Sequence, residues 1–156
     1  MWTGTQAIRL NPGDPDVRVL RAGVYTDKGQ LDEAIREYET ALSFDPINDP
    51  AWMDLGIVYY LAGRPQDAAE ILKQNLDQRP DRVAAWAVLA AARQAELGST
   101  TQAEEAAAEV LRLNPFFSAE DLAAPYAQPD LRKRLTAGLQ RGGGCRNLLG
   151  RPDYLP

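Results

Sequence analysis

One 18-residue segment occurs three times along the chain at an almost constant interval. The copies begin at Gly29, Gly63 and Gly98, which are 34 and 35 residues apart. Each copy has an alanine at the same offset and ends in a proline: Ala34, Ala68 and Ala103, then Pro46, Pro80 and Pro115. A period of this length is the signature of a chain built from stacked copies of one small unit. The fold is therefore expected to repeat along its length.

The half-unit before each glycine also recurs, and its apolar residues have helical spacing. Trp52 and Leu55 align with Trp86 and Leu89. Trp52, Leu55 and Tyr59 stand at positions i, i+3 and i+7, which lie on one face of an α-helix. The sequence therefore predicts a helix before each glycine.

The segment after each glycine has a helical face as well, made in the first copy by Leu31, Ala34, Ile35, Tyr38 and Leu42. Glycine readily takes the backbone angles of a tight turn between helices, and a residue before a proline tends to leave the helix. Each unit is thus predicted to be a helical hairpin. Because one hairpin cannot bury both of its apolar faces, the copies must stack.

The pattern resembles the tetratricopeptide repeat, a 34-residue helical hairpin with characteristic Trp, Leu-Gly, Tyr, Ala and Pro positions. The second copy matches it most fully, at Trp52, Leu55, Gly56, Tyr59, Ala68 and Pro80. The other two copies match at Tyr25, Ala34, Tyr38, Ala41 and Pro46, and at Trp86, Leu89, Ala90, Ala103 and Pro115. The resemblance implies an all-α fold, an α-solenoid of about three tetratricopeptide hairpins with a partial N-terminal helix and a C-terminal capping helix. We expect the repeats at 15–48, 49–82 and 83–117.

The start of the chain reads as half a repeat. Residues 7–12 match residues 41–46 at a distance of 34 residues, so 1–14 are expected to be the second helix of a preceding hairpin. Either the chain is a piece of a longer array or starts late within one, or this segment is an N-terminal cap. A missing partner helix would leave Ile8 and Leu10 uncovered, and exposed apolar surface favours self-association.

The pattern changes after the third repeat. Phe116 and Phe117 are expected to pack on the last hairpin, and Ser118 is expected to cap a helix. We interpret 118–141 as a C-terminal cap with a short first helix and a basic second one. Its second helix is weakly similar to bacterial repeat modules attached to nucleotide-cyclase-type proteins. Residues 142–156 lack periodicity and are expected to be a mobile tail, a cloning scar or the product of an altered reading frame.

The resemblance also implies where a ligand would bind, because the first helix of each tetratricopeptide hairpin lines a concave groove. The corresponding positions are Val19, Gly23, Thr26, Asp27, Met53, Asp54, Ile57, Tyr60, Ala87, Val88 and Ala91. This mostly small and apolar lining suits an amphipathic helix or an extended apolar segment. The alternative is that these side chains pack against neighbouring hairpins.

One subclass of the family holds a peptide's terminal carboxylate with Lys, Arg and Asn in the groove. The matching positions here carry Val19, Gly23, Asp54, Ala84 and Val88, none of which is basic. The sequence therefore argues against such a carboxylate clamp. Asp27 and Asp54 could instead attract a basic ligand.

Composition excludes several kinds of chemistry. The chain has no histidine and one cysteine, Cys145, so it can form neither a His/Cys zinc cluster, nor a catalytic triad with histidine, nor an internal disulfide. Cys145 is expected to be an exposed bystander. We expect no enzyme activity and no cofactor. No apolar run reaches the ~20 residues that span a bilayer, so the prediction is a cytoplasmic protein without membrane contact.

The charge is unevenly distributed. Residues 129–156 hold six Lys/Arg and two Asp/Glu, a balance of +4, while 1–128 hold 11 and 20, a balance of −9. An acidic body repels nucleic acid. The predicted partner is therefore a protein or peptide. Two alternatives stay open: a regulatory segment of a larger enzyme such as a nucleotide cyclase, and a module that self-assembles through its N-terminal edge.

Overall fold

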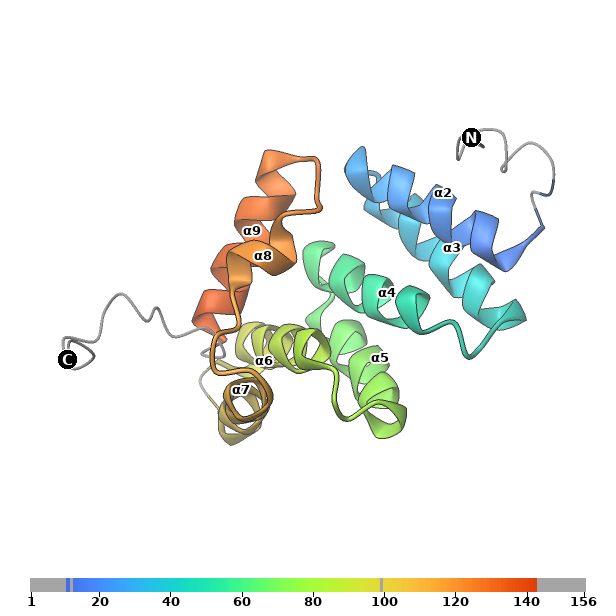
Figure 1. Ribbon diagram of the computed structural model, residues 1–156. Helices are drawn as coiled ribbons and strands as arrows, with labels where there is room; N and C mark the ends of the chain where they lie inside the picture. The colour runs from blue at the N-terminus through green and yellow to red at the C-terminus, as the bar shows by residue number, and fades with distance from the viewer. Residues whose placement is uncertain (1–10, 12, 99, 143–156) are drawn as a thin grey trace.

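The computed structural model describes residues 11, 13–98 and 100–142, and within these ranges the chain is entirely helical. The helices, in chain order, are α2 (Pro15–Asp27), α3 (Leu31–Phe44), α4 (Asp49–Leu61), α5 (Pro65–Gln78), α6 (Val83–Leu97), α7 (Thr101–Leu113), α8 (Ala119–Ala123) and α9 (Pro129–Arg141). The first six form three hairpins that stack side by side (Figure 1). The chain is thus an α-solenoid of three hairpins. The predicted half repeat at its start falls almost wholly outside the described residues.

Local sequence explains where the helices begin. Four of them start behind a side chain that accepts a hydrogen bond from a backbone N–H of the first turn, which otherwise has no partner in the helix. These capping residues are Asp14, Asn48, Thr100 and Ser118. Ser118 accepts from the N–H of Asp121 at 3.1 Å, which confirms the cap expected there.

The turns within the hairpins depend on glycine. Gly29, Gly63 and Gly98 have φ of 73°, 75° and 76°, and they are the only described residues with positive φ. Side chains other than glycine are disfavoured in this left-handed region. The regular spacing of these glycines in the sequence therefore reflects a backbone requirement.

Two matched Gly→Ala substitutions should change stability in opposite directions. A Cβ atom at Gly23 or at Gly63 would meet no other group within 4 Å, so neither change causes a clash. Gly23 lies inside helix α2, where alanine should stabilise by roughly 0.5–1 kcal/mol. Gly63 has positive φ, so alanine should destabilise by about 1 kcal/mol. Urea denaturation of both variants tests this, and a shift of the two midpoints in the same direction would contradict it.

The repeats are joined by hydrogen bonds at equivalent positions. The indole N–H of Trp52 donates to the carbonyl of Pro46 at 2.8 Å, and that of Trp86 donates to Pro80 at 2.9 Å. Each bond thus ties the first helix of a hairpin to the loop that precedes it. The two tryptophans that align in the sequence play the same structural part.

A carboxylate at the start of α4 holds the end of the second hairpin and the loop that leads into the third. Asp49 accepts a hydrogen bond from the side-chain amide of Asn75 at 3.0 Å, and it pairs with the guanidinium groups of Arg79 and Arg82. One acidic group thereby contacts the last turn of α5, through Asn75, and the loop between α5 and α6, through Arg79 and Arg82. Its loss would leave Asn75 and Arg82 without this partner, whereas Arg79 also pairs with Asp81 at 3.5 Å.

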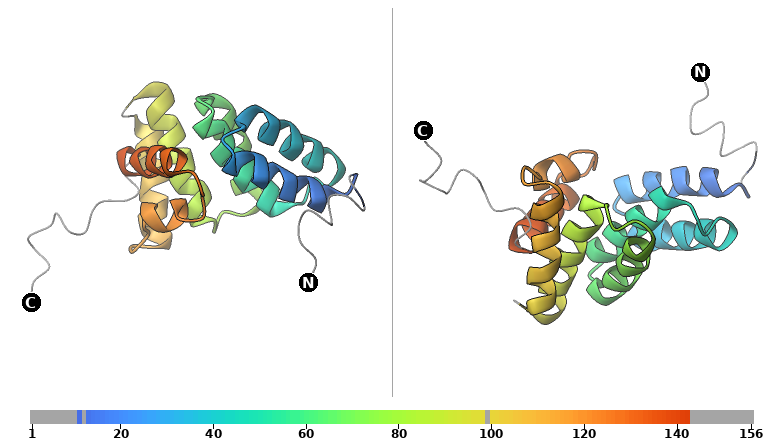
Figure 2. Two further views of the ribbon diagram at one scale, coloured as in Figure 1. Left: turned by 90° about the horizontal axis from the view of Figure 1, so that it is seen from above. Right: turned by 60° about the horizontal axis from the view of Figure 1, so that its bottom comes forward.

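The last two helices do not extend the stack. Helix α9 packs on α6 and α4, and α8 packs on α9 (Figures 1 and 2). We call the surface formed by α2, α4 and α6, the first helices of the three hairpins, the inner face. Three leucines of α9 with a spacing of four are buried: Leu131, Leu135 and Leu139. The expected basic second helix of the C-terminal segment therefore exists and lies across the inner face.

One expectation for this region was wrong. Phe116 does not pack on the last hairpin, since 80% of its surface is exposed. Its neighbour Phe117 does pack against the core. Asn114 accepts a hydrogen bond from the backbone N–H of Phe116, and the resulting turn separates the two aromatic side chains. Only one of them can face inward.

Candidate functional site

The predicted groove positions on α4 and α6 form a closed surface rather than an open channel. Met53, Ile57, Ala87, Val88 and Ala91 are all buried, with at most 6% of any residue exposed. Tyr60 and Asp54 are half-buried. On α2, Thr26 is buried, Val19 and Gly23 are half-buried, and Asp27 is exposed. The predicted positions therefore do lie on one face, but part of that face is covered.

Helix α9 approaches the inner face through two glycines. A Cβ atom at Gly138 would overlap the hydroxyl oxygen of Tyr60 and lie 2.5 Å from its Cζ. A Cβ atom at Gly142 would lie 2.8 Å from the backbone nitrogen of Ala91. Both approaches are far closer than a van der Waals contact. At Gly142 the neighbour is backbone, so no side chain fits, whereas a side chain at position 138 would have to displace the Tyr60 ring. The covering helix is matched in shape to the predicted groove.

Two hydrogen bonds between distant residues fix the C-terminal hairpin on the repeats. The guanidinium of Arg134 donates to the backbone carbonyl of Leu61, at the end of α4. At the other end of the inner face, the backbone N–H of Ala127 donates to the carboxylate of Asp27 at 3.3 Å. Asp27 is therefore already engaged by the chain itself.

Two phenols, one buried and one half-buried, lie near Asp54. The hydroxyl of Tyr38 donates to this carboxylate at 3.5 Å, and Tyr126 comes from the loop between α8 and α9. Burial raises the pKa of Asp54 from 3.8 to about 6, while the Tyr38 bond opposes the rise. Burial, then the nearby Asp54 charge, also raises the pKa of Tyr38 and of Tyr126. Asp54 is thus half-buried and already bonded to Tyr38, which makes it a poor site for a basic ligand.

The raised pKa of Asp54 predicts a stabilising substitution. Between pH 4 and 6 the folded chain holds the Asp54 proton more tightly than the unfolded chain, so this group's contribution to stability falls as pH rises through that window. Asp54→Asn removes the buried charge, and we expect it to stabilise by about 1 to 2 kcal/mol at pH 7.5. At pH 4 the variant and the wild type should unfold at nearly the same urea concentration. A variant less stable at pH 7.5 would show that the Tyr38 bond outweighs burial.

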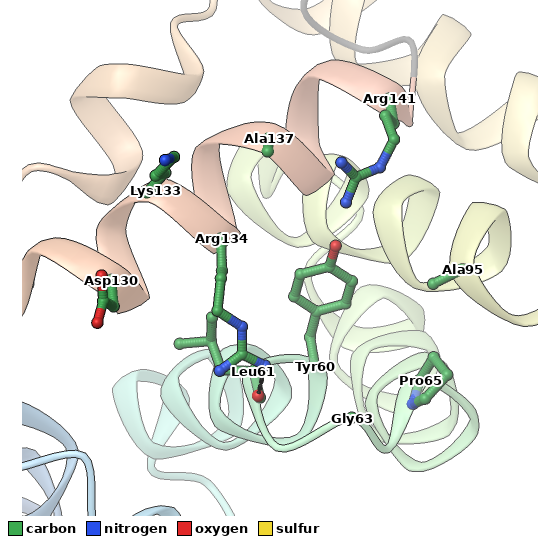
Figure 3. A pocket seen from close by; sticks show the side chains of 10 residues that line it. All are labelled: Tyr60, Leu61, Gly63, Pro65, Ala95, Asp130, Lys133, Arg134, Ala137 and Arg141. Carbon is green, nitrogen blue, oxygen red and sulfur yellow. Dashed lines mark hydrogen bonds between the residues drawn. The ribbon is translucent and has the colours of Figure 1, made fainter.

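A cleft remains open beside α9. It has a volume of about 830 Å³ and lies between α9, the turn joining α4 to α5, and the end of α6 (Figure 3). Its lining residues are Tyr60, Leu61, Gly63, Pro65, Ala95, Asp130, Lys133, Arg134, Ala137 and Arg141. Of the predicted groove residues, only Tyr60 lines it. The sequence shows the basic balance of this region but not its proximity to Tyr60, because the two are about 70 residues or more apart.

Two of the positions that would form a carboxylate clamp lie partly or fully inside the protein. Ala84 is half-buried and Val88 is fully buried, and neither side chain has a polar group that could bind a carboxylate.

Within the described residues, no group of three His, Cys, Asp or Glu is placed to hold a metal ion. None of the described helices is long and apolar enough to cross a membrane.

Comparison with curated proteins gives relatives that share the repeat. Small glutamine-rich tetratricopeptide repeat-containing protein 2 of Saccharomyces cerevisiae is 31% identical over 77 residues, which are 49% of this chain and 22% of the relative. The protein of the same name from Mycosarcoma maydis is 32% identical over 104 residues, 66% and 30% of the two chains. Hsp70-Hsp90 organizing protein 2 of Arabidopsis thaliana is 29% identical over 77 residues, 49% and 14%. The chain spans less than a third of the length of each.

Two solved structures share the fold. MamA superposes with a TM-score of 0.66 at 17% identity, over 89% of this chain and 82% of MamA. YrrB, described as a TPR protein with an unusual peptide-binding site, superposes with a TM-score of 0.60 at 19% identity, over 89% and 72%. Identity at this level bears on the fold alone. The weak similarity to modules attached to nucleotide cyclases stays a prediction.

A known family model matches the part of the chain that holds the sequence repeats and the helical hairpins. The family model described as tetratricopeptide repeat matches residues 25–92, from the end of α2 to the middle of α6. The relatives named above from Saccharomyces cerevisiae and Mycosarcoma maydis carry the same repeat in their names. The match confirms the resemblance to the tetratricopeptide repeat over residues 25–92.

Proposed function

We propose that this chain is a protein-binding scaffold whose inner face receives a helical segment of a partner protein at the place that α9 takes here. The observation that carries the proposal is the fit of α9 itself. Its leucines are buried, it packs on α4 and α6, and its glycine at position 138 lies against Tyr60. A surface that accommodates one amphipathic helix can accommodate another with the same pattern.

The surface defines the chemistry of that helix. Alanines such as Ala87 and Ala91 let a helix backbone approach closely, and leucines spaced by four would replace those of α9. A small residue opposite Tyr60 fits without displacing its ring. The ligand is therefore an amphipathic helix with a narrow apolar stripe and a glycine or similarly small residue within it.

Exchange of α9 for a partner helix is supported by its few polar attachments. Within the described residues, the hydrogen bonds that join the C-terminal hairpin to the repeats are those of Arg134 and Ala127. Because α9 is tethered to the same chain, its effective concentration at the inner face is on the order of millimolar. A partner helix must overcome this competition.

A labelled synthetic peptide with the sequence of residues 129–141 tests the proposal on the full chain. We expect weak binding to the wild type and binding at least about tenfold tighter to Gly138→Leu, whose own α9 cannot lie against Tyr60. The matched control is Arg132→Leu, which adds the same side chain at an exposed position of α9. Fluorescence anisotropy measures both affinities.

A second variant provides an independent way to release α9. Leu135 is fully buried, so Leu135→Asp should also release α9. Hydrogen exchange of the α9 amides reports whether release has occurred. If α9 is released in either variant and the peptide still binds no more tightly than to wild type, the inner face is not a helix-binding site.

Self-association through the N-terminal edge is a second proposal, favoured by one observation. Leu20 and Val24 on α2 are 52% and 45% exposed, although both are large and apolar. Ile8 and Leu10, for which the sequence predicts the same role, lie outside the described residues. We expect a concentration-dependent mass in sedimentation velocity that Leu20→Glu, Val24→Glu abolishes. A constant monomer mass for wild type up to about 1 mM would exclude this role.

A further inference from the structure

In the part of the chain that the structure describes, the arginines of α9 differ from those of the repeats in that they have no acidic partner. Within the described residues, every arginine of α2 to α7 and of the loops between these helices has an acidic partner within 4 Å: Arg18, Arg21, Arg36, Arg64, Arg79, Arg82, Arg93 and Arg112. Across residues 11, 13–98 and 100–142, no such ion pair involves the four cations of α9, which are Arg132, Lys133, Arg134 and Arg141. Helix α9 therefore carries a cluster of unneutralised cations on a chain of net charge −5.

Three of these four cations line the cleft beside α9. Lys133, Arg134 and Arg141 contribute to its wall together with a single carboxylate, that of Asp130. All three are exposed, and Arg134 also donates to the carbonyl of Leu61, whereas no ion pair among the described residues involves Lys133 or Arg141. The cleft is therefore positive and has cations that are available to a ligand.

The opposite wall supplies a phenol and apolar contacts. Figure 3 shows the ring of Tyr60 between α9 and the turn that joins α4 to α5, with its hydroxyl directed toward α9. Pro65 and Ala95 lie on that side, and Ala137 lies on α9 between the cations. A ligand in this cleft would meet positive charge along one side and apolar groups along the other.

We infer that this cleft binds an acidic peptide segment that also carries apolar side chains. Its carboxylates would pair with Arg141 and Lys133, and the Tyr60 hydroxyl would donate to one of them. Apolar side chains would lie on Pro65 and Ala95. A volume of about 830 Å³ suits a segment of a few residues.

A peptide fits these observations better than a nucleic acid does. Binding along a phosphate backbone needs an extended basic track, whereas residues 1–128 have a charge balance of −9. The apolar wall of the cleft also has no counterpart in a phosphate backbone. The ligand is therefore a protein segment in which acidic and apolar residues are interspersed.

This inference rests on the proposed scaffold function and extends it to a second surface. Helix binding on the inner face needs α9 to leave, whereas peptide binding in the cleft needs α9 to stay. Because α9 forms one wall, the cleft exists only while α9 lies on the inner face. Release of α9 by Gly138→Leu should therefore weaken binding of an acidic peptide while it strengthens binding of the α9-like helix. The two proposals can consequently fail independently.

The test uses the full chain and three labelled probes. One is a peptide that alternates acidic residues with leucine, the second is the same peptide with each acidic residue replaced by its amide, and the third is a single-stranded oligonucleotide of similar charge to the first. Fluorescence anisotropy at low salt is expected to show at least about tenfold tighter binding of the acidic peptide than of either other probe. Raising NaCl from about 50 to about 300 mM should weaken it severalfold, because exposed charges are screened.

Matched variants locate the site on α9. Arg141→Gln is expected to weaken the acidic peptide about fivefold or more, and Lys133→Gln, Arg141→Gln further still. Arg132→Gln removes the same charge from the same helix outside the cleft and should leave affinity within about twofold. Tyr60→Phe removes only the hydroxyl and should weaken binding about two- to fivefold.

Three results would overturn the assignment. Equal losses in Arg141→Gln and Arg132→Gln would mean that only the overall charge of α9 matters. Equal binding of the acidic and amide peptides would exclude carboxylate recognition. Tighter binding of the oligonucleotide than of the acidic peptide would identify the cations as a phosphate-binding surface instead.

Discussion

Replacing Gly56 by leucine is expected to destabilise the chain by about 3 kcal/mol or more, because the new side chain has no space in the core. Gly56 lies in α4 where this helix packs on α5, and an added Cβ atom would lie 2.6 Å from Cδ2 and 2.7 Å from Cγ of Leu72. Leu72 is fully buried in the core and has no room to move aside. The two helices of the middle hairpin would have to separate. Because each repeat is stabilised by its neighbours, the effect should spread to the whole stack.

Gly23→Leu is the control for this prediction. It places the same side chain in helix α2, where the Cβ atom would meet nothing within 4 Å. Leucine favours the helix over glycine, so stability should change by less than about 1 kcal/mol. Urea denaturation followed by circular dichroism compares the variants. Similar losses for both would show that close packing at Gly56 is not what fixes the hairpin.

Gly138→Leu is expected to release α9 from the inner face while the three hairpins stay folded. The new side chain would overlap the Tyr60 ring, whose Cζ lies 2.5 Å from the added Cβ position. The α9 amides should then lose at least about tenfold of their protection against hydrogen exchange, and those of α3 and α5 should keep theirs. The physical reason is that α9 is attached through its own packing, whereas the hairpins are stabilised by one another.

A second substitution distinguishes release of α9 from a general loss of stability. Tyr60→Ala removes the ring that the leucine would strike, so the double variant Tyr60→Ala, Gly138→Leu should recover much of the α9 protection. Tyr60 is half-buried, so its removal alone should cost little more than the contacts it makes to α9. Protection that stays lost in the double variant would mean that α9 is not held against Tyr60.

The hairpins could be predicted because their signals are local. The glycines at 29, 63 and 98 recur in the sequence because the turns need positive φ. Trp52 and Trp86 align because each closes an equivalent hydrogen bond to the proline carbonyl six residues earlier. Helix periodicity and turn residues are read within windows of about 15 residues. No contact between distant residues had to be known.

The covering of the inner face could not be predicted in the same way. Gly138 and Tyr60 are 78 residues apart, and Ala127 and Asp27 are 100 apart. The sequence around α9 shows an amphipathic helix with leucines spaced by four, but nothing in it says which surface those leucines cover. An ordinary capping position on the last hairpin fits the same pattern. The position of α9 depends on the close approach of Gly138 to Tyr60 and of Gly142 to the backbone of α6.

The sequence by itself determined the repeat, the hairpins and the absence of basic groups at the clamp positions, because these follow from residue type and spacing. Only the tertiary structure decided that the predicted groove residues of α4 and α6 lie largely buried and that α9 lies across the inner face. It also decided that the cations of α9 meet Tyr60 at one cleft. The reason is physical: periodicity fixes which face of a helix is apolar, whereas the partner of that face is selected by close packing between residues far apart in the chain.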